Sequence, residues 1–127
     1  MKRVLVAGGS GFVGASLVRR LLRDGDEVHL LLRRCHAGWR LQEVLPNVRL
    51  HEADVRDRDA VLDAVRRIRP ERTFHLAAYG AYSQQKGIEQ MVATNLLGCV
   101  HLLDACADVG CEAFVHTGSS SEYGYKD

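Results

Sequence analysis

A glycine-rich segment near the beginning of the chain constrains the fold more than any other feature. Four glycines fall within residues 8–14, between an apolar run at residues 4–7 and a helical apolar pattern that starts at Val13. Glycine loses more conformational entropy than any other residue when it is fixed, so some benefit must offset that loss. A tight turn, close helix–strand packing, or a ligand that needs bare backbone would each supply it.

Short apolar runs and amphipathic helical patterns alternate along the rest of the chain. Asp57 is a suitable N-cap for a helix that Pro70 ends, and a further helical pattern covers residues 88–106. The segment 34–47 is irregular, with room for one or two helical turns. The apolar runs predict strands at residues 4–7, 28–32, 48–51, 73–78 and 113–117, of which the third alternates like a half-exposed edge.

Strands that alternate with helices form parallel sheets with right-handed crossovers. The order of elements therefore predicts an α/β fold of the Rossmann type. In this fold a doubly wound parallel sheet of strand order 3-2-1-4-5 carries helices on both faces. With 127 residues, the chain is long enough for one domain with its own core.

Composition argues against several classes of partner. The chain is 46% hydrophobic and 26% charged with a formal net charge of +1, so no overall field favours nucleic acid or a membrane surface. No apolar segment is long enough to span a bilayer. The four cysteines form neither a Cys-x-x-Cys pair nor a zinc-binding spacing, so we expect reduced thiols, no metal site and a cytoplasmic location.

The glycine segment is expected where α/β sheets bind ligands, beyond the carboxyl end of a strand and at the N-terminus of a helix. Unpaired backbone amides and the positive end of the helix dipole suit a pyrophosphate there. Two dinucleotide-binding spacings overlap, G-x-G-x-x-G from Gly9 and G-x-x-G-x-x-G from Gly8, and the pattern alone does not choose between them. A plain strand–helix turn is the alternative to a cofactor-binding loop made by Gly8, Gly9, Ser10, Gly11, Phe12, Val13 and Gly14.

The end of the second predicted strand bears on the choice of cofactor. A carboxylate at this position binds the ribose 2′-hydroxyl of NAD. Here Arg33 and Arg34 follow the strand, and two guanidinium groups can bind a 2′-phosphate. The sequence therefore favours NADP, with NAD as the alternative, unless both arginines belong only to a solvated turn.

Five short motifs occur in register over the whole chain. They are Gly8-x-x-Gly11-x-x-Gly14, Ala53-Asp54-Val55, His75-Leu76-Ala77-Ala78, Thr94-Asn95-Leu96-Leu97-Gly98 and Thr117-Gly118-Ser119-Ser120-Ser121-Glu122-Tyr123-Gly124. Together they resemble the extended short-chain dehydrogenase/reductases, and most closely the NAD(P)-dependent epimerases, dehydratases and reductases of nucleotide sugars. Each motif alone is a weak signal, and their shared order makes the resemblance specific.

The resemblance implies roles for individual residues. Asp54 and the backbone of Val55 would contact adenine, and small side chains after the fourth strand would let the dinucleotide lie across the strand end. Asn95 would brace the loop above that strand, and its place on an apolar helical stripe predicts a buried amide with partners. The implied cofactor contacts are Asp54, Val55, Leu76, Ala77, Ala78, Asn95 and Thr117, with plain strand packing as the alternative for residues 76–78.

Ser119 matches the family's catalytic serine or threonine, whose hydroxyl hydrogen-bonds the sugar oxygen that becomes, or was, a carbonyl. Dehydratases of this family commonly carry an acid pair at the next two positions, and the serines found here favour an epimerase or a ketoreductase. A polar loop without chemistry is the alternative. The residues assigned to the substrate side are Tyr79, Tyr82, Ser120 and Ser121.

The family's catalytic base is a tyrosine in a Tyr-x-x-x-Lys motif downstream of this serine. The chain's own Tyr82-x-x-x-Lys86 precedes Ser119, so we expect it to line a loop rather than to act as that pair. The resemblance therefore implies that residues 1–127 form the NAD(P)-binding Rossmann domain of a longer enzyme, without its C-terminal substrate-binding part.

The leading hypothesis is an NAD(P)-dependent oxidoreductase or epimerase that transfers hydride at a hexose ring carbon of a nucleotide-diphosphate sugar. We expect the full-length enzyme to be a homodimer that binds neither nucleic acid nor membrane. A non-catalytic dinucleotide-binding module and an NADPH reductase of a non-sugar carbonyl are the alternatives.

Overall fold

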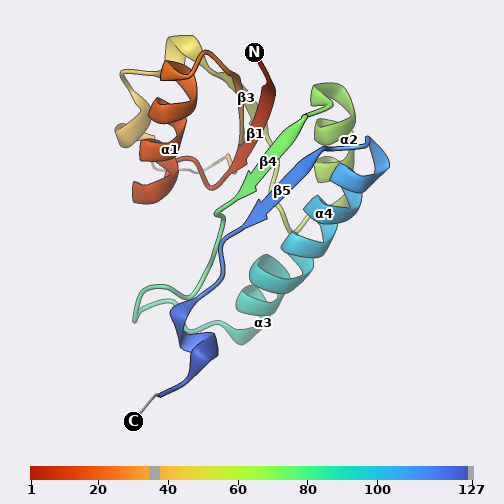
Figure 1. The fold of residues 1–127 in the computed structure, drawn as a ribbon. Helices are drawn as coiled ribbons and strands as arrows, with labels where there is room; N and C mark the ends of the chain where they lie inside the picture. Colours follow the sequence, from red (N-terminus) through yellow and green to blue (C-terminus); the bar gives the residue numbers. More distant parts are fainter. Residues whose placement is uncertain (35–37, 126–127) are drawn as a thin grey trace.

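The structure, a computed structural model, describes residues 1–34 and 38–125. Five parallel strands form one sheet in the order β3-β2-β1-β4-β5, which confirms the expected strand order (Figure 1). The strands are β1 (Arg3–Ala7), β2 (Glu27–Leu32), β3 (Arg49–Glu52), β4 (Arg72–His75) and β5 (Ala113–His116). The strand order reverses direction at β1, where sheets of this kind bind their ligands.

Helices cover both faces of the sheet because alternate residues of its central strand point to opposite sides. Val4 and Val6 pack with α1 (Phe12–Arg23), whereas Leu5 and Ala7 pack with α2 (Arg58–Ile68) and α4 (Gly98–Asp108). All four side chains are fully buried. This burial on both faces explains why β1 reads as an unbroken apolar run.

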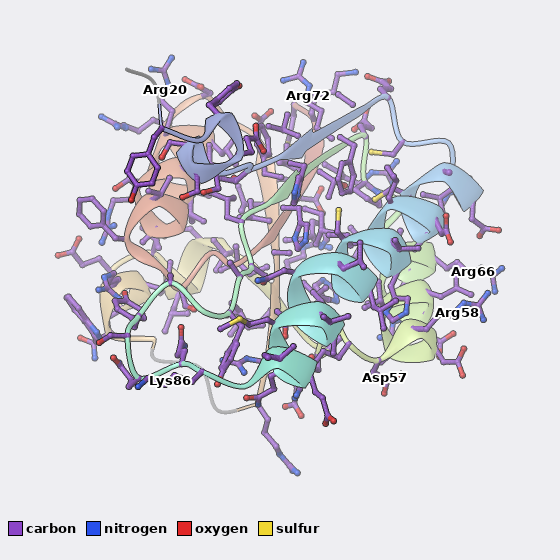
Figure 2. All side chains as sticks on the ribbon, turned by 90° about the horizontal axis from the view of Figure 1, so that it is seen from below. Arg20, Asp57, Arg58, Arg66, Arg72 and Lys86 are labelled. Carbon is purple, nitrogen blue, oxygen red and sulfur yellow. The ribbon has the colours of Figure 1, made fainter. Side chains whose placement is uncertain are left out.

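The local sequence sets the ends of α2. An Asp57 carboxylate oxygen accepts a hydrogen bond from the Ala60 amide at 3.1 Å, and Arg69 adopts a left-handed conformation just before Pro70. Figure 2 shows Asp57 and Arg58 at the start of this helix and Arg66 farther along it. The irregular segment contains two short turns, η1 (Trp39–Leu41) and η2 (Leu45–Asn47), in agreement with the sequence.

Two expected elements are wrong in detail. The fourth strand was expected to reach residue 78, but β4 ends at His75 because Ala7 and His116 are the last residues that pair with it. The helix expected over residues 88–106 is interrupted. It consists of α3 (Ile88–Met91), the π-helical segment η3 (Val92–Leu97) and α4, and a π turn adds a residue that apolar periodicity does not reveal.

The stripe of apolar residues on this helical region is wider than the surface that covers it. Leu102 and Cys106 are buried against the sheet and α2, whereas Leu96, Val100 and Leu103 are 43–59% exposed. No helix within the described ranges has both the length and the apolar character that a membrane span requires.

Candidate functional site

A cleft of about 410 Å³ lies where the strands of the sheet end at their carboxyl side. Its walls come from the end of β2, from the segments that follow β1, β2, β3 and β4, and from Thr94 of η3, so separate parts of the chain meet around it. The lining residues are Gly8, Ser10, Gly11, Leu31, Leu32, Arg33, Arg40, Ala53, Asp54, Val55, Leu76, Ala77, Ala78, Tyr79, Tyr82, Gln85 and Thr94. A second cleft of similar volume lies against α1 and Trp39, and the strand ends do not form its walls.

Packing accounts for two of the glycines beside the cleft. Gly8 has a φ of +86°, and a Cβ atom there would lie 2.5 Å from the backbone of Leu76 and Ala77. A Cβ atom on Gly14 would overlap the carbonyl oxygen of Gly8. The turn, the first helix and the end of β4 therefore approach so closely that these positions require glycine.

Gly11 differs from these two glycines. Its φ is −74°, and the nearest atom to a Cβ placed there is the Gly8 carbonyl oxygen at 3.5 Å, an ordinary van der Waals contact. Gly11 is exposed and lines the cleft at the start of α1. Neither the turn nor packing requires glycine here, although glycine is favoured over alanine as the N-cap of α1. The open space beside it leaves room for a ligand. Gly14 approaches both Gly8 and Gly9, so the contacts agree with either of the two overlapping glycine spacings.

The two arginines after β2 lie in different surroundings. Arg33 lines the cleft, whereas Arg34 lies outside its lining, with Nε 3.7 Å from a Glu52 carboxylate oxygen. Sequence reasoning missed Arg40, which also lines the cleft and donates to the Ser10 carbonyl oxygen at 3.5 Å. The Arg40 guanidinium lies over the Trp39 ring at 4.3 Å. The available sequence signal for Arg40 was a basic residue next to Trp39. Because segment 34–47 has no regular pattern, the sequence could not show that this arginine lies at the cleft.

Asp54 lies on the cleft wall and is paired with Arg56. Its two carboxylate oxygens accept hydrogen bonds from Arg56 at 2.6–3.0 Å. These hydrogen bonds hold the pKa of the Asp54 carboxyl below its usual range, so the group is charged. Next to it, Val55 is buried under Gly98, where an added Cβ would lie 2.8 Å from the valine side chain.

Asn95 braces the loop after β4, as the resemblance implied. Its side-chain oxygen accepts from the Tyr79 amide at 2.8 Å, and its Nδ2 donates to the Tyr79 carbonyl at 2.7 Å. The expectation that this amide is buried is wrong: Asn95 is exposed because none of the described residues covers that side of η3. Gln85 supports the same loop by accepting from the Gly80 amide at 2.9 Å, a contact that the sequence did not suggest.

The remaining expected site residues lie outside the cleft lining. Phe12 and Val13 are exposed at the start of α1, and Gly9 packs beneath the turn. The Ser119 hydroxyl accepts from the Ser121 amide at 3.2 Å and caps the short turn η4 (Ser120–Tyr123). The exposed residues of this C-terminal segment that the sequence singled out are Thr117, Ser119, Ser120 and Ser121.

Comparison with known proteins extends over almost all of the chain. The model of the NAD dependent epimerase/dehydratase family matches residues 4–127. A UDP-glucose 4-epimerase of Lactobacillus helveticus is 30% identical over 123 residues, which are 96% of this chain and 37% of that protein. A probable dTDP-glucose 4,6-dehydratase of Sinorhizobium fredii is 35% identical over 107 residues, covering 80% of this chain and 31% of its own length.

A solved structure agrees with the fold. The UDP-glucose-4-epimerase from Stenotrophomonas maltophila, with bound NAD and formylated UDP-arabinopyranose, is 25% identical and matches with a TM-score of 0.87. The match covers all of this chain and 40% of that one, so the chain spans well under half the length of these relatives. The family match, the strand order and the glycine turn together show that this chain belongs to the NAD dependent epimerase/dehydratase family.

Proposed function

We propose that residues 1–127 form the dinucleotide-binding domain of a longer enzyme that acts on a nucleotide-diphosphate sugar. The bound nicotinamide would exchange hydride with a hexose ring carbon. The observation that carries this proposal is Gly11, a glycine on the cleft wall that neither the turn nor packing requires. The named substrates of the relatives, UDP-glucose and dTDP-glucose, support the substrate class.

The described residues fit a dinucleotide. Bare backbone at Gly11 and the start of α1 would hold the pyrophosphate, where the helix dipole favours negative charge. Asp54 and Val55 would face adenine, and Ala77 with Ala78 would leave room for the rest of the cofactor along the strand end. Because Asp54 already accepts from Arg56, a bond from the adenine amine would have to share a carboxylate oxygen with that arginine.

The substrate side is proposed from the loops around the cleft mouth. Tyr79 and Tyr82 line the cleft, and Ser119 would donate to the reacting sugar oxygen with Ser120 and Ser121 beside it. A hydroxyl donor placed there would stabilise the charge that develops on that oxygen. The exposed apolar side chains of η3 and α4 support a homodimer of the longer enzyme.

We further propose that NADP is the preferred cofactor, because Arg33 lines the cleft at the end of β2 and Arg40 lies on the same wall. A guanidinium bound to a 2′-phosphate contributes a charge-assisted hydrogen bond. The relative from Stenotrophomonas maltophila holds NAD, so the preference depends on the arginines of this chain alone.

Titration with NADPH and NADH, followed by nicotinamide fluorescence or calorimetry, tests both proposals. Arg33→Asp should weaken NADPH binding by about 1.5–3 kcal/mol, roughly 10- to 150-fold, and should leave NADH binding nearly unchanged. Arg34→Asp is the matched control, because Arg34 faces Glu52 outside the cleft lining. If the chain binds neither NADPH nor NADH, the proposed function is wrong. If Arg33→Asp leaves the NADPH affinity unchanged, only the proposed preference for NADP is wrong.

A further inference from the structure

Three metal-ligating side chains meet between the sheet and α4. His75 and His116 are paired in register at the ends of β4 and β5, so both point to the same face of the sheet. Cys99 lies in the first turn of α4, the helix that packs on this face, with its Sγ 3.7 Å from His116 Nδ1. The two imidazole centroids are 5.2 Å apart, and one ligand atom from each of the three residues lies within 4.8 Å of the others.

His75 gives an independent reason to expect a ligand here. Its side chain is 1% exposed, and neither ring nitrogen has a hydrogen-bond partner among residues 1–34 and 38–125. Burying an imidazole without a partner is unfavourable, and such groups in native proteins are uncommon.

We propose that His75, Cys99 and His116 bind one transition-metal ion of the zinc class. With metal–sulfur bonds of about 2.3 Å and metal–nitrogen bonds of about 2.0–2.1 Å, a tetrahedral ion requires sulfur–nitrogen separations of about 3.5 Å. The observed 3.7 Å between Cys99 Sγ and His116 Nδ1 is close to that value. Three protein ligands would leave the fourth position for water.

The donor set decides the class of ion. One thiolate and two imidazoles favour zinc or a similar borderline-soft metal over magnesium or calcium, which prefer oxygen ligands. His116 is exposed and Cys99 half-buried, so an ion can enter from solvent. On binding, the Cys99 thiol would lose its proton to water as the sulfur–metal bond forms.

The site is separate from the cofactor cleft, because none of the three side chains lines that cleft. Its ligands come from three elements far apart in the sequence. The expectation of no metal site considered only local cysteine spacing, and strand register is what brings these residues together. A bound ion would link β4 and β5 to α4.

Titration of the reduced chain with Co²⁺ tests the site, since cobalt reports thiolate coordination through a charge-transfer absorption. We expect saturation at one ion per chain and a thiolate–cobalt band, with Zn²⁺ displacing the cobalt. Cys99→Ser should abolish the band, and His116→Gln should weaken binding at least about 100-fold, because even the outer partners of metal ligands contribute about 10- to 100-fold.

Cys111→Ser is the matched control, because Cys111 Sγ instead contacts the carbonyl oxygens of Glu71 and Ala113. It should bind cobalt as the parent chain does. Both site variants change partly exposed side chains, and far-ultraviolet circular dichroism will establish that they remain folded. Absence of saturable binding, or a charge-transfer band that survives Cys99→Ser, would overturn the proposal.

Discussion

Alanine at Gly11 and at Gly14 should separate ligand binding from packing within a single turn. At Gly11 the new methyl group meets only the Gly8 carbonyl oxygen at 3.5 Å, so the fold accepts it. Because alanine is a poorer helix N-cap than glycine, we expect the free energy of unfolding to fall by about 0.5–1 kcal/mol. Gly11 lines the cleft where we propose that the pyrophosphate binds, so a methyl group there should weaken dinucleotide binding at least about 10-fold, or about 1.4 kcal/mol.

Gly14→Ala should behave in the opposite way. Its Cβ would overlap the Gly8 carbonyl oxygen and lie 2.8 Å from the Gly9 Cα, and backbone atoms cannot rotate aside. Overpacking of this kind typically costs about 1–3 kcal/mol. Alanine recovers up to about 1 kcal/mol of helix propensity, but the overlap is severe, so we expect a net loss of about 2 kcal/mol in the free energy of unfolding.

Urea unfolding, followed by circular dichroism, measures the free energy of unfolding. Titration of the folded variants with NADH and NADPH measures the dinucleotide affinity. We expect Gly11→Ala to remain stable but to bind the dinucleotide weakly, and Gly14→Ala to be less stable than the parent chain. Unchanged dinucleotide affinity in Gly11→Ala would refute the role assigned to its bare backbone. Equal stability of the two variants would refute the packing argument.

Three further predictions concern the surroundings of the cleft and the exposed helix face. Asn95→Ala removes both side-chain bonds to Tyr79, so hydrogen exchange of the Tyr79 amide should accelerate while global unfolding by urea changes by about 1 kcal/mol or less. Hydrogen bonds from Arg56 hold the folded-state pKa of Asp54 below its usual value. This pairing therefore stabilises the fold while the carboxylate is charged, and the stabilisation is lost as the pH falls through the lowered pKa. In Arg56→Gln, the free energy of unfolding measured with urea should therefore fall less steeply as the pH is lowered than it does in the parent chain. If the exposed apolar stripe forms the proposed dimer contact, Leu103→Glu should lower the self-association that sedimentation measures, because this side chain is 47% exposed on the stripe.

The sequence was most informative where one residue type has a local physical consequence. The apolar run around Val6 predicted a central strand and Asp57 predicted a helix start. The glycine segment left a tight turn as one of three possibilities, and at Gly8 the structure shows such a turn. In each case the determining interaction lies within a few residues or depends on burial alone. Such interactions can be predicted from the apolar pattern and from the residue types that favour turns.

Other features depend on contacts between distant segments, and no local pattern records them. Arg40 reaches the cleft only because the irregular segment folds back toward Ser10. The cluster of His75, Cys99 and His116 depends on the register between β4 and β5 and on the rotation of α4. The exposure of Asn95 follows from a helix face that the described residues leave uncovered, which periodicity cannot distinguish from a buried face.

The two sides of the cleft differ in how firmly the fold holds them. The side formed by β1 and β2 rests on fully or almost fully buried strands, so its backbone is positioned before any ligand binds. The opposite side, from Tyr79 to Gln85, is largely exposed and is held by side-chain bonds from Asn95 and Gln85. Segments with few buried contacts open at low free-energy cost. We therefore expect the side formed by β1 and β2 to be preorganised for the proposed diphosphate, whereas amides of the loop from Tyr79 to Gln85 should exchange hydrogen faster than those of β1 and β2.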